Sequence, residues 1–321
     1  MRAVRVTRFG GPEVLEVSEL PDPMAGAGEV VVGTEVAPVL RLDTQLRQGW
    51  GREWFPMKPP YVPGSGVAGR VLSVGADVDP ALVGRAVVAD VFGGYAARVA
   101  VPVEALIAVP DGLSMREAAA QLHDGRTAVR LAEVVGLRPH EWVLVTGAGG
   151  ALGLLLVQLA HAAGGRVIAA ARDRRKLDMA RALNAQRVVD YSAPDWTEQV
   201  RAMTGGHGVD VVFDGVGGRI GAAALDLTVH TGRFSAHGFA AGDSTPVDTA
   251  AAARRGVTVF GMEHVRLSGT IATSATATAL AATAAGRLRP VIGQTFPLER
   301  AADAHTAIEE RTALGKTLLL I

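Results

Sequence analysis

The segment Trp142–Gly153, WVLVTGAGGALG, constrains the fold more than any other part of the chain. The apolar run Trp142–Thr146 predicts a buried strand, and the apolar run Leu154–Ala163 predicts a helix. Four glycines lie in the turn and at the helix start: Gly147, Gly149, Gly150 and Gly153. Such glycines let a pyrophosphate approach the backbone, and the helix N-terminus offers N–H groups to it. The spacing is GxxGxxG rather than GxGxxG, so a purely structural glycine turn stays open as an alternative.

A second apolar run, Arg166–Ala171, predicts the next strand and ends in a cluster of positive charge. NAD-binding sheets place a carboxylate at the end of this strand, where it holds the ribose hydroxyls. Here that position is Arg172, with Lys176 one helical turn later, and cations suit a 2′-phosphate. The pattern therefore predicts NADPH. Two alternatives remain: Asp173 takes the carboxylate role if the strand ends one residue later, or the cluster is a solvated helix start.

Length and composition limit the class of protein. A chain of 321 residues can form two domains, each with its own core. The formal net charge of +0 gives no indication of nucleic acid or of an anionic membrane surface as a partner. The absence of cysteine excludes thiolate metal sites, and the eight histidines form no HxH or HExxH pair, so we expect no metal. We expect no signal peptide and no transmembrane segment, and hence a cytoplasmic location.

The hydrophobic pattern changes twice along the chain. Residues 1–122 show short alternating segments punctuated by Gly and Pro, which predicts an antiparallel β-domain, most simply a barrel. Residues 123–264 alternate helical and buried-strand patterns, which predicts a doubly wound parallel sheet. Residues 265–321 are mixed and are expected to rejoin the first domain. The fold class is therefore α/β, with a β-barrel domain and a Rossmann domain inserted into it.

The elements expected from these patterns are strands at Val30–Val36, Gly66–Val74, Arg85–Val91, Arg187–Asp190, Val209–Asp214, Gly232–Ala236, Val257–Gly261, Ile292–Pro297 and Thr317–Ile321, and helices at Arg126–Val135, Arg174–Leu183, Trp196–Met203, Ala275–Ala285 and Glu299–Arg311.

Several motifs, in the same order, resemble those of one family. They are Met1–Pro23, PGSGVAG at Pro63–Gly69, GYA at Gly94–Ala96, VPDG at Val109–Gly112, GGHGVDVVFDGVGG at Gly205–Gly218, and Arg311–Ile321. Over nearly its full length the chain resembles the zinc-independent quinone oxidoreductases of the medium-chain dehydrogenase/reductase superfamily. The resemblance implies a GroES-like β-barrel domain for substrate and a Rossmann domain for NADPH.

The resemblance also assigns site residues. It implies that the glycine turn, with Ala151 and Leu152, holds the pyrophosphate, and that Lys176, Tyr191 and Arg311 lie near the 2′-phosphate and adenine ribose. It implies that Thr127 lines the nicotinamide pocket. The residues implied to border the nicotinamide half of the cofactor are Gly215, His237, Gly238 and Phe239. Ordinary structural roles remain open for each; Tyr191, for example, also fits a surface aromatic.

The chain departs from the family at the reacting end of the cleft. Where the family has an asparagine three residues before an aspartate and a tyrosine two residues after it, this chain has Leu40, Asp43 and Gln45. The glutamate usual in the PGxExAG loop is Ser65 or Val67, depending on the register. Some of the polar side chains that could hydrogen-bond a substrate in the family are therefore missing here.

Hydride transfer asks the protein mainly to hold the reactants and to stabilise a developing oxyanion. Without a metal, the candidate donors are Thr127, Gln45 and backbone N–H groups, and His123 is the first candidate acid, with Asp43 weaker. A structural domain-junction histidine is an equal alternative for His123. Aromatic residues at Trp50, Trp54, Phe55 and Tyr61 suit a hydrophobic substrate or a self-packed surface loop.

The expected function is a zinc-free, NADPH-dependent oxidoreductase that transfers hydride to a conjugated carbonyl: a quinone, an enone or an enoyl thioester. The alternatives are an NADPH-binding relative acting on a dedicated secondary metabolite, and a non-catalytic nucleotide-binding protein. The resemblance further implies a homodimer joined through the strand Val257–Gly261, although a tetramer stays open.

Overall fold

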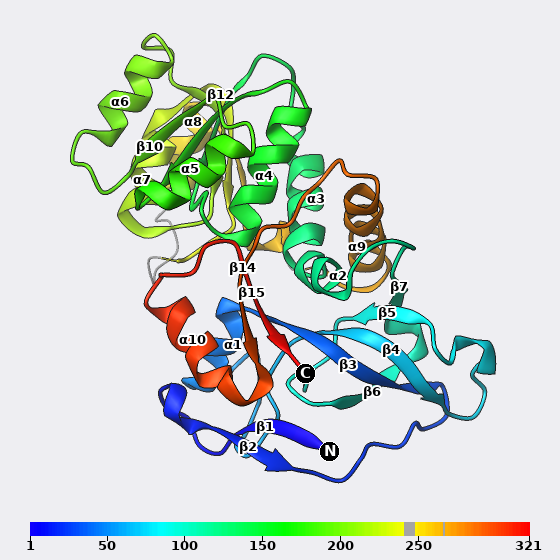
Figure 1. Ribbon diagram of the computed structural model, residues 1–321. Coiled ribbons are helices and arrows are strands. Elements are labelled where there is room, and N and C mark those ends of the chain that lie inside the picture. The colour runs from blue at the N-terminus through cyan, green and yellow to red at the C-terminus, as the bar shows by residue number, and fades with distance from the viewer. Residues whose placement is uncertain (241–247, 266) are drawn as a thin grey trace. The chain divides into compact units, whose positions relative to one another are not determined.

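The computed structural model describes residues 1–240, 248–265 and 267–321. Its contacts divide the chain into two compact units, Met1–His123 with Thr276–Ile321, and Asp124–Ala275 (Figure 1). The sequence patterns put the boundaries at 122/123 and 264/265, whereas the units in the structure divide after His123 and after Ala275. The second unit is therefore an insertion in the first.

The inserted unit is built on a six-stranded parallel sheet, as the α/β prediction requires. The strand order is β10-β9-β8-β11-β12-β13. The strands are β8 (Trp142–Thr146), β9 (Arg166–Ala171), β10 (Arg187–Asp190), β11 (Val209–Asp214), β12 (Thr228–Ala236) and β13 (Thr258–Phe260). The order reverses between β8 and β11, so the carboxyl edge of the sheet has a topological switch point there.

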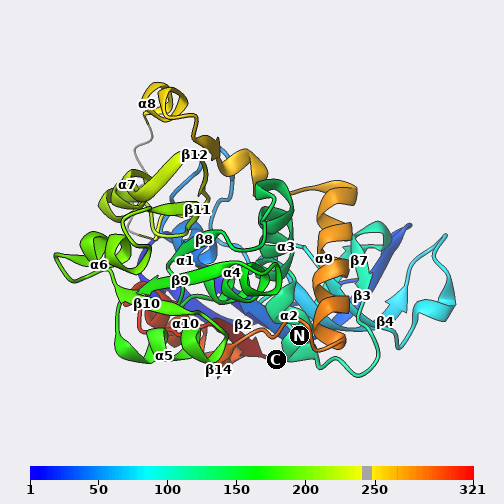
Figure 2. The same cartoon turned by 90° about the horizontal axis from the view of Figure 1, so that it is seen from above.

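Helices cover both faces of this sheet, because a parallel strand pair needs a crossover connection. They are α3 (Asp124–Val135), α4 (Ala151–Ala162), α5 (Arg174–Ala182), α6 (Trp196–Met203), α7 (Gly218–Leu227) and α8 (Thr249–Arg254). Helices α3 and α4 pack together on one face, and α6 and α7 pack together on the other (Figure 2). All five residues of β8 are buried, which is why its sequence reads as an unbroken apolar run.

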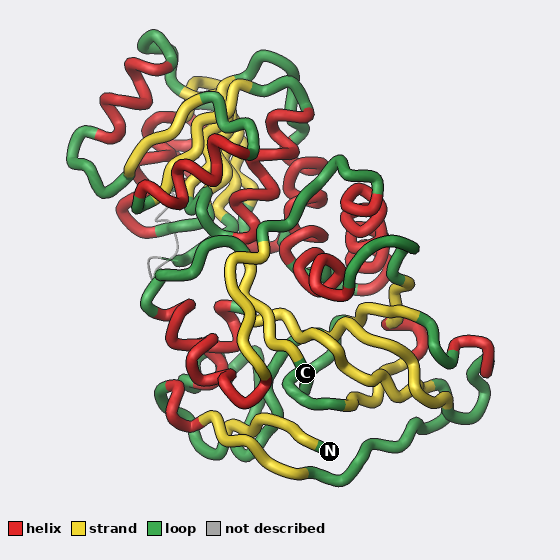
Figure 3. Tube along the Cα trace, in the orientation of Figure 1, coloured by secondary structure: helices red, strands yellow, loops and turns green. Residues whose placement is uncertain are grey.

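The other unit contains a seven-stranded sheet in the order β14-β15-β3-β4-β5-β7, with β6 paired to β3 (Figure 3). Its strands are β3 (Glu29–Val39), β4 (Val67–Val74), β5 (Ala86–Ala89), β6 (Arg98–Pro102), β7 (Leu106–Ala108), β14 (Ile292–Pro297) and β15 (Lys316–Leu320). A separate antiparallel pair is formed by β1 (Arg2–Val6) and β2 (Leu15–Glu19). Strand β15, near the C-terminus, pairs with β3 and so belongs to this sheet.

This sheet is not wholly antiparallel, because β14 and β15 are parallel neighbours. Helix α10 (Ala301–Glu309) connects them, so the C-terminal segment is a β-α-β unit added to an antiparallel sheet. Helix α10 also packs against α1 (Arg41–Arg47) (Figure 1).

The chain also forms helices that the sequence patterns did not predict, namely α1, α2 (Met115–Gln121), α7 and α8. Helix α2 begins with a capping box, in which Ser114 and Glu117 satisfy each other's backbone amides. Helix α9 (Gly269–Ala284) begins six residues before the predicted start, and β12 begins four residues before it. The predicted strand Val257–Gly261 is observed as β13, at the end of the described sheet order.

Candidate functional site: a nucleotide-binding edge and a buried polar network

The glycine turn between β8 and α4 is tight enough to exclude side chains. Gly147 has φ +66°, a conformation that favours glycine. A Cβ atom on Gly153 would lie 2.5 Å from the Gly147 carbonyl oxygen and 2.9 Å from the Ala148 Cα, so the helix can pack this closely only with glycine there. The turn therefore brings bare backbone to the carboxyl edge of the sheet, which is what a pyrophosphate site requires.

The N-terminus of α4 faces this turn. Gly150 is its N-cap, with no side-chain cap hydrogen bond, and Ala151 and Leu152 form its first turn and are partly exposed. The first amides of a helix have no intrahelical acceptor, and the helix dipole favours an anion beside them. The twelve-residue helix thus presents donor groups directly beside the glycine turn.

Cationic side chains lie beside the same turn. Strand β9 ends at Ala171, so the exposed Arg172 follows it directly. A Cβ atom on Gly149 would come within 2.6 Å of the Lys176 side-chain stem, so that stem lies across the glycine turn. Asp173 caps α5, its carboxylate accepting a hydrogen bond from the Lys176 backbone N–H at 3.2 Å. Because the strand stops before Arg172, this arrangement favours the cation over Asp173 at the ribose position.

Tyr191 follows β10 and is partly buried. The guanidinium of Arg172 lies over its ring, 5.9 Å from the centroid, within the range of a cation–π contact. Arg172, Lys176 and Tyr191 therefore come together at one side of the glycine turn, although they are spread over two strand ends and a helix.

A buried hydrogen-bond network links the ends of β8 and β11. The Asp214 carboxylate is fully buried and accepts from the Thr146 hydroxyl at 2.6 Å and from the amides of Val216 and Gly217. The Thr146 hydroxyl in turn accepts from the Gly215 amide at 3.1 Å. This network fixes the path of the chain where it leaves β11.

The residues after β12 pack onto this bend. The amides of His237 and Gly238 both donate to the Asp214 carbonyl oxygen, at 3.2 and 3.0 Å. A Cβ atom on Gly238 would lie 2.2 Å from the Gly215 carbonyl oxygen, so this close approach requires glycine at position 238. Burial lowers the pKa of His237 to about 4, which keeps its ring neutral. Phe239 follows and is partly buried.

The other unit holds Asp43 in a buried polar network. Its carboxylate accepts from the Leu40 amide at 2.8 Å, the Ser65 hydroxyl at 2.9 Å and the Tyr95 hydroxyl at 3.3 Å. The Tyr95 oxygen lies 3.1 Å from His305 Nε2. Burial raises the pKa of the Asp43 carboxyl, opposed by the hydrogen bonds from Leu40 and Ser65.

The remaining predicted residues are divided between the units. His123 is buried in the first, with Nε2 3.4 Å from Asp90, and Gln45 lies in α1 with its amide oxygen buried. Thr127 lies in α3 of the inserted unit and is partly exposed. Arg311 follows α10, is exposed, and has φ +60°.

The pKa of the Arg41 guanidinium is lowered, mainly by burial and secondly by the positive charge of the nearby Arg311. The first unit thus places two positive charges near each other.

The residues that sequence reasoning missed are mostly second partners. Thr146, Ser65, Tyr95, Ser235 and His305 orient the predicted residues. Three of them carried a signal in the sequence: Thr146 ends the predicted strand next to the glycine turn, and Ser65 and Tyr95 lie in the motifs PGSGVAG and GYA.

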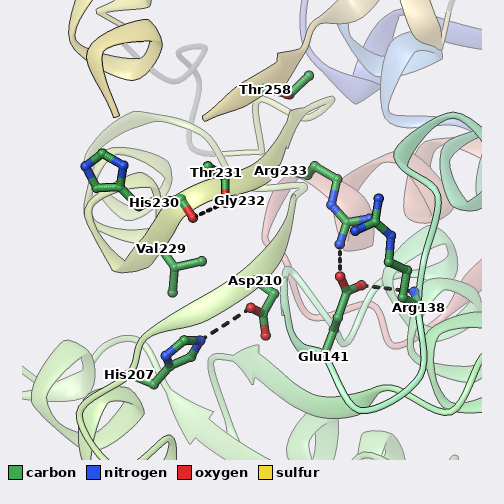
Figure 4. Close-up of a pocket in the computed structure, with 10 residues that line it drawn as sticks. All are labelled: Arg138, Glu141, His207, Asp210, Val229, His230, Thr231, Gly232, Arg233 and Thr258. Atoms are coloured by element: carbon green, nitrogen blue, oxygen red, sulfur yellow. Dashed lines mark hydrogen bonds and ion pairs between the residues drawn. The ribbon is translucent and has the colours of Figure 1, made fainter. Parts of the chain in front are cut away.

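The inserted unit also has a polar pocket of about 660 Å³, shown in Figure 4. Its lining residues are Arg138, Glu141, His207, Asp210, Val229, His230, Thr231, Gly232, Arg233 and Thr258. They come from the segments that enter β8, β11, β12 and β13, hence from the amino edge of the sheet. Its carboxylates are paired internally, Glu141 with Arg233 and Asp210 with His207. Since nucleotides bind at the carboxyl edge, this pocket is not the cofactor site.

Among the described residues, no three His, Asp or Glu side chains come together as a metal site would need. No helix in the described part of the chain has the length and apolar character to cross a membrane.

A switch-point Rossmann sheet with a glycine turn, joined to a GroES-like unit, defines the class of two-domain, dinucleotide-binding dehydrogenases and reductases. Family models agree: "Alcohol dehydrogenase GroES-like domain" matches residues 26–111, and "Zinc-binding dehydrogenase" matches residues 151–282.

Known proteins are similar over the whole chain. The 2-haloacrylate reductase of Burkholderia sp is 30% identical over 327 residues, covering 99% of this chain and 98% of its own. The quinone oxidoreductase of Sus scrofa is 30% identical over 335 residues, covering 100% and 98%. The crystal structure of Escherichia coli quinone oxidoreductase complexed with NADPH has a TM-score of 0.91 at 26% identity and covers both chains fully. The chain belongs to the zinc-independent quinone oxidoreductase family of the medium-chain dehydrogenase/reductase superfamily.

Proposed function

We propose that this protein is a zinc-independent, NADPH-dependent oxidoreductase that reduces a conjugated carbonyl: a quinone, an enone or an enoyl thioester. The observation that carries the proposal is the glycine turn crossed by the Lys176 stem, with Arg172 at the end of β9. The relatives act on substrates of this kind by name, and one neighbour was solved with NADPH.

The residues present suit this cofactor. The glycines at 149 and 153 let the Lys176 stem and the Gly147 carbonyl pack directly on the backbone of the turn, and the uncapped start of α4 offers amides to a pyrophosphate. Arg172, Lys176 and Tyr191 would hold the phosphorylated ribose, and Arg311 is proposed to contribute to the same phosphate. NADPH supplies the hydride from its nicotinamide ring.

The protein's own task is then to orient the reactants and to support charge on the substrate oxygen. Thr127 and Gln45 are the proposed hydrogen-bond donors, with Asp43 held in place by its buried network. His123 is the proposed proton donor, because its ring is held beside Asp90 and it is the last residue of the first unit before the chain enters the inserted one. A hydrophobic substrate is supported by the exposed rings of Trp50 and Trp54, whose centroids lie 5.7 Å apart.

We further propose a homodimer joined through β13, because this short strand ends the described sheet order and offers backbone groups for pairing. Sedimentation equilibrium at micromolar protein tests this, and a monomer would contradict it. A cytoplasmic location remains a prediction for fractionation of the source cells.

The experiment for the main proposal is to follow NADPH oxidation with a panel of 1,4-quinones, enones and enoyl thioesters, with NADH in parallel. We expect turnover with at least one class and a strong preference for NADPH. NADPH binding without turnover of any panel member would favour a dedicated metabolite or a non-catalytic role.

A further inference from the structure

The polar pocket at the amino edge of the inserted unit has no part in the proposed function (Figure 4). Its volume of about 660 Å³ lies within the range of small-molecule sites. Among the described residues that line it, Val229 carries the only apolar side chain, and all the others except Gly232 carry charged or hydrogen-bonding groups. Such a lining suits a small and strongly polar ligand.

An ion pair between Glu141 and Arg233 is a fixed part of the pocket wall (Figure 4). Only 15% of the Glu141 side chain and 13% of the Arg233 side chain are exposed. Arg233 also donates to the carbonyl oxygens of Val135, at 3.0 Å, and Gly136, and the Arg138 amide donates to Glu141 at 2.9 Å. The two charges of this pair therefore balance each other within the wall.

The second carboxylate of the pocket, Asp210, is likewise satisfied by the protein. Its Oδ2 accepts from the Trp142 amide at 2.7 Å, and its Oδ1 lies 3.4 Å from Nε2 of His207. Each carboxylate of the pocket thus already has donors from the protein on both of its oxygens, an arrangement that leaves it a weak ligand for a cation.

Donor groups of the pocket remain without partners. The Arg138 guanidinium, the His230 ring and the Thr258 hydroxyl have no hydrogen bond or ion pair with any residue that the structure describes, and all three line the pocket. A guanidinium presents five N–H donors in a fork that matches the oxygens of a carboxylate or a phosphate. The unbalanced charge of the pocket is therefore positive, and its unused side chains are donors.

A bulge in β12 brings part of this lining to the pocket. Thr228 is paired with β11, and Arg233 is paired with it again, but residues 229–232 stand outside this pairing. Within the bulge Thr231 has φ +61°, a conformation that is costly for a residue other than glycine. Bulges and strained residues recur beside binding sites, where they direct side chains that a regular strand would point elsewhere.

We propose that this pocket binds a small organic oxyanion, with Arg138 as its principal ligand and with His230 and Thr258 as further donors. A neutral imidazole keeps one N–H, so His230 can donate in either protonation state. The volume is larger than a bare phosphate ion fills, and the same donors suit the oxygens of a phosphate ester and of a polycarboxylate. Because the pocket lies at the edge opposite the glycine turn, the inference does not depend on the proposed function.

The test is calorimetric titration with citrate and with a hexose 6-phosphate at constant ionic strength. Protein saturated with NADPH is used, so that the probes cannot occupy the cofactor's phosphate site; the Arg172→Leu/Lys176→Met variant serves the same purpose if NADPH does not bind. We expect one probe to bind once per chain in the sub-millimolar range. Tighter binding of citrate would identify a polycarboxylate site, and tighter binding of the hexose phosphate a phosphate-ester site.

Substitutions in the pocket then locate the binding. Arg138→Gln keeps the backbone amide on Glu141 and should weaken the bound probe about five- to twentyfold, the worth of a charge-assisted hydrogen bond reduced by solvent screening. His230→Gln should weaken it by a smaller factor. The matched control is Arg187→Gln, an exposed arginine at the amino end of β10 that does not line the pocket, and it should bind as wild type does. Absence of binding for both probes, or equal weakening in Arg138→Gln and Arg187→Gln, would overturn the proposal.

Discussion

Replacing the two cations beside the glycine turn tests the cofactor assignment most directly. The variant is Arg172→Leu with Lys176→Met. Methionine retains an unbranched stem of similar length, so the cover over Gly149 stays in place while the charge is removed. Leucine at Arg172 removes the guanidinium above the Tyr191 ring, at an exposed position where a side-chain change costs the fold little.

The expected effect follows from the two hydrogen bonds to the 2′-phosphate that the variant cannot make. A charge-assisted hydrogen bond is worth roughly 1.5–3 kcal/mol, and solvent screening at this partly exposed edge reduces that to about 1–2 kcal/mol each. The two hydrogen bonds together therefore contribute about 2–4 kcal/mol to binding. Losing them should raise the dissociation constant for NADPH roughly 30- to 1,000-fold. NADH lacks the 2′-phosphate, so its dissociation constant should change less than about threefold.

The assay is fluorescence titration with NADPH and NADH, repeated at two salt concentrations. The control is Arg174→Leu with Arg175→Leu, which removes two positive charges from the first turn of α5 while leaving the residues beside Gly149 intact. Loss of NADPH affinity should also reduce its salt dependence. An equal loss for both cofactors, or an equal NADPH loss in the control, would refute the argument that these two side chains read the phosphate.

Three further outcomes follow from individual residues. Gly153→Ala should lower the free energy of unfolding by about 1–3 kcal/mol and weaken NADPH binding, because its Cβ would lie 2.5 Å from the Gly147 carbonyl oxygen; urea unfolding and titration check both, and wild-type values would contradict the packing argument. Burial lowers the pKa of His305 from 6.5 to about 3, so the unfolded chain takes up a proton that the folded one does not, and the free energy of unfolding falls between those pH values as pH decreases. His305→Gln should remove about 1.2 kcal/mol per pH unit from that slope in urea titrations at pH 5 and 6, and an unchanged slope would exclude this source. His123→Ala should depress turnover and alter its pH profile at unchanged NADPH affinity; an unaltered profile would return His123 to a structural role beside Asp90.

Much of the inserted unit could be predicted, because the sequence patterns that specify its strands and helices lie within the elements themselves. The strands β8, β9, β10 and β11 and the helix α6 have the predicted bounds, since each is an apolar or amphipathic run ended by glycine or charge. The glycine turn and the cations after β9 could be placed on the sheet edge from sequence spacing alone. Helix α7 was not predicted. It begins GRIG, which is a weak helical start, and it packs on β11 and β12 in the folded unit.

The polar network of the first unit could not be predicted, because its members are far apart in the chain. Tyr95 is 52 residues from Asp43 and 210 residues from His305. The local sequence around a buried tyrosine does not show whether its hydroxyl hydrogen-bonds to residues that are distant in the chain. The parallel pairing of β14 with β15 could not be predicted either, because only the connection through α10 makes the two strands run in the same direction.

The departures from the family pattern, at positions 40 and 45, fall where the local structure depends on backbone hydrogen bonds rather than on these side chains. Leu40 stands where the family pattern implies an asparagine, yet its backbone amide still closes the first turn of α1 by donating to the Asp43 carboxylate at 2.8 Å. Gln45 lies in the same short helix, whose place is held by the Asp43 bonds to Ser65 and Tyr95 and by the ion pair between Arg47 and Glu309. Side chains at positions 40 and 45 can therefore change without moving the helix. Such changes alter what the helix offers to a substrate and leave the cofactor edge of the other unit as it was, so this family member should differ from its relatives in substrate choice more than in cofactor choice.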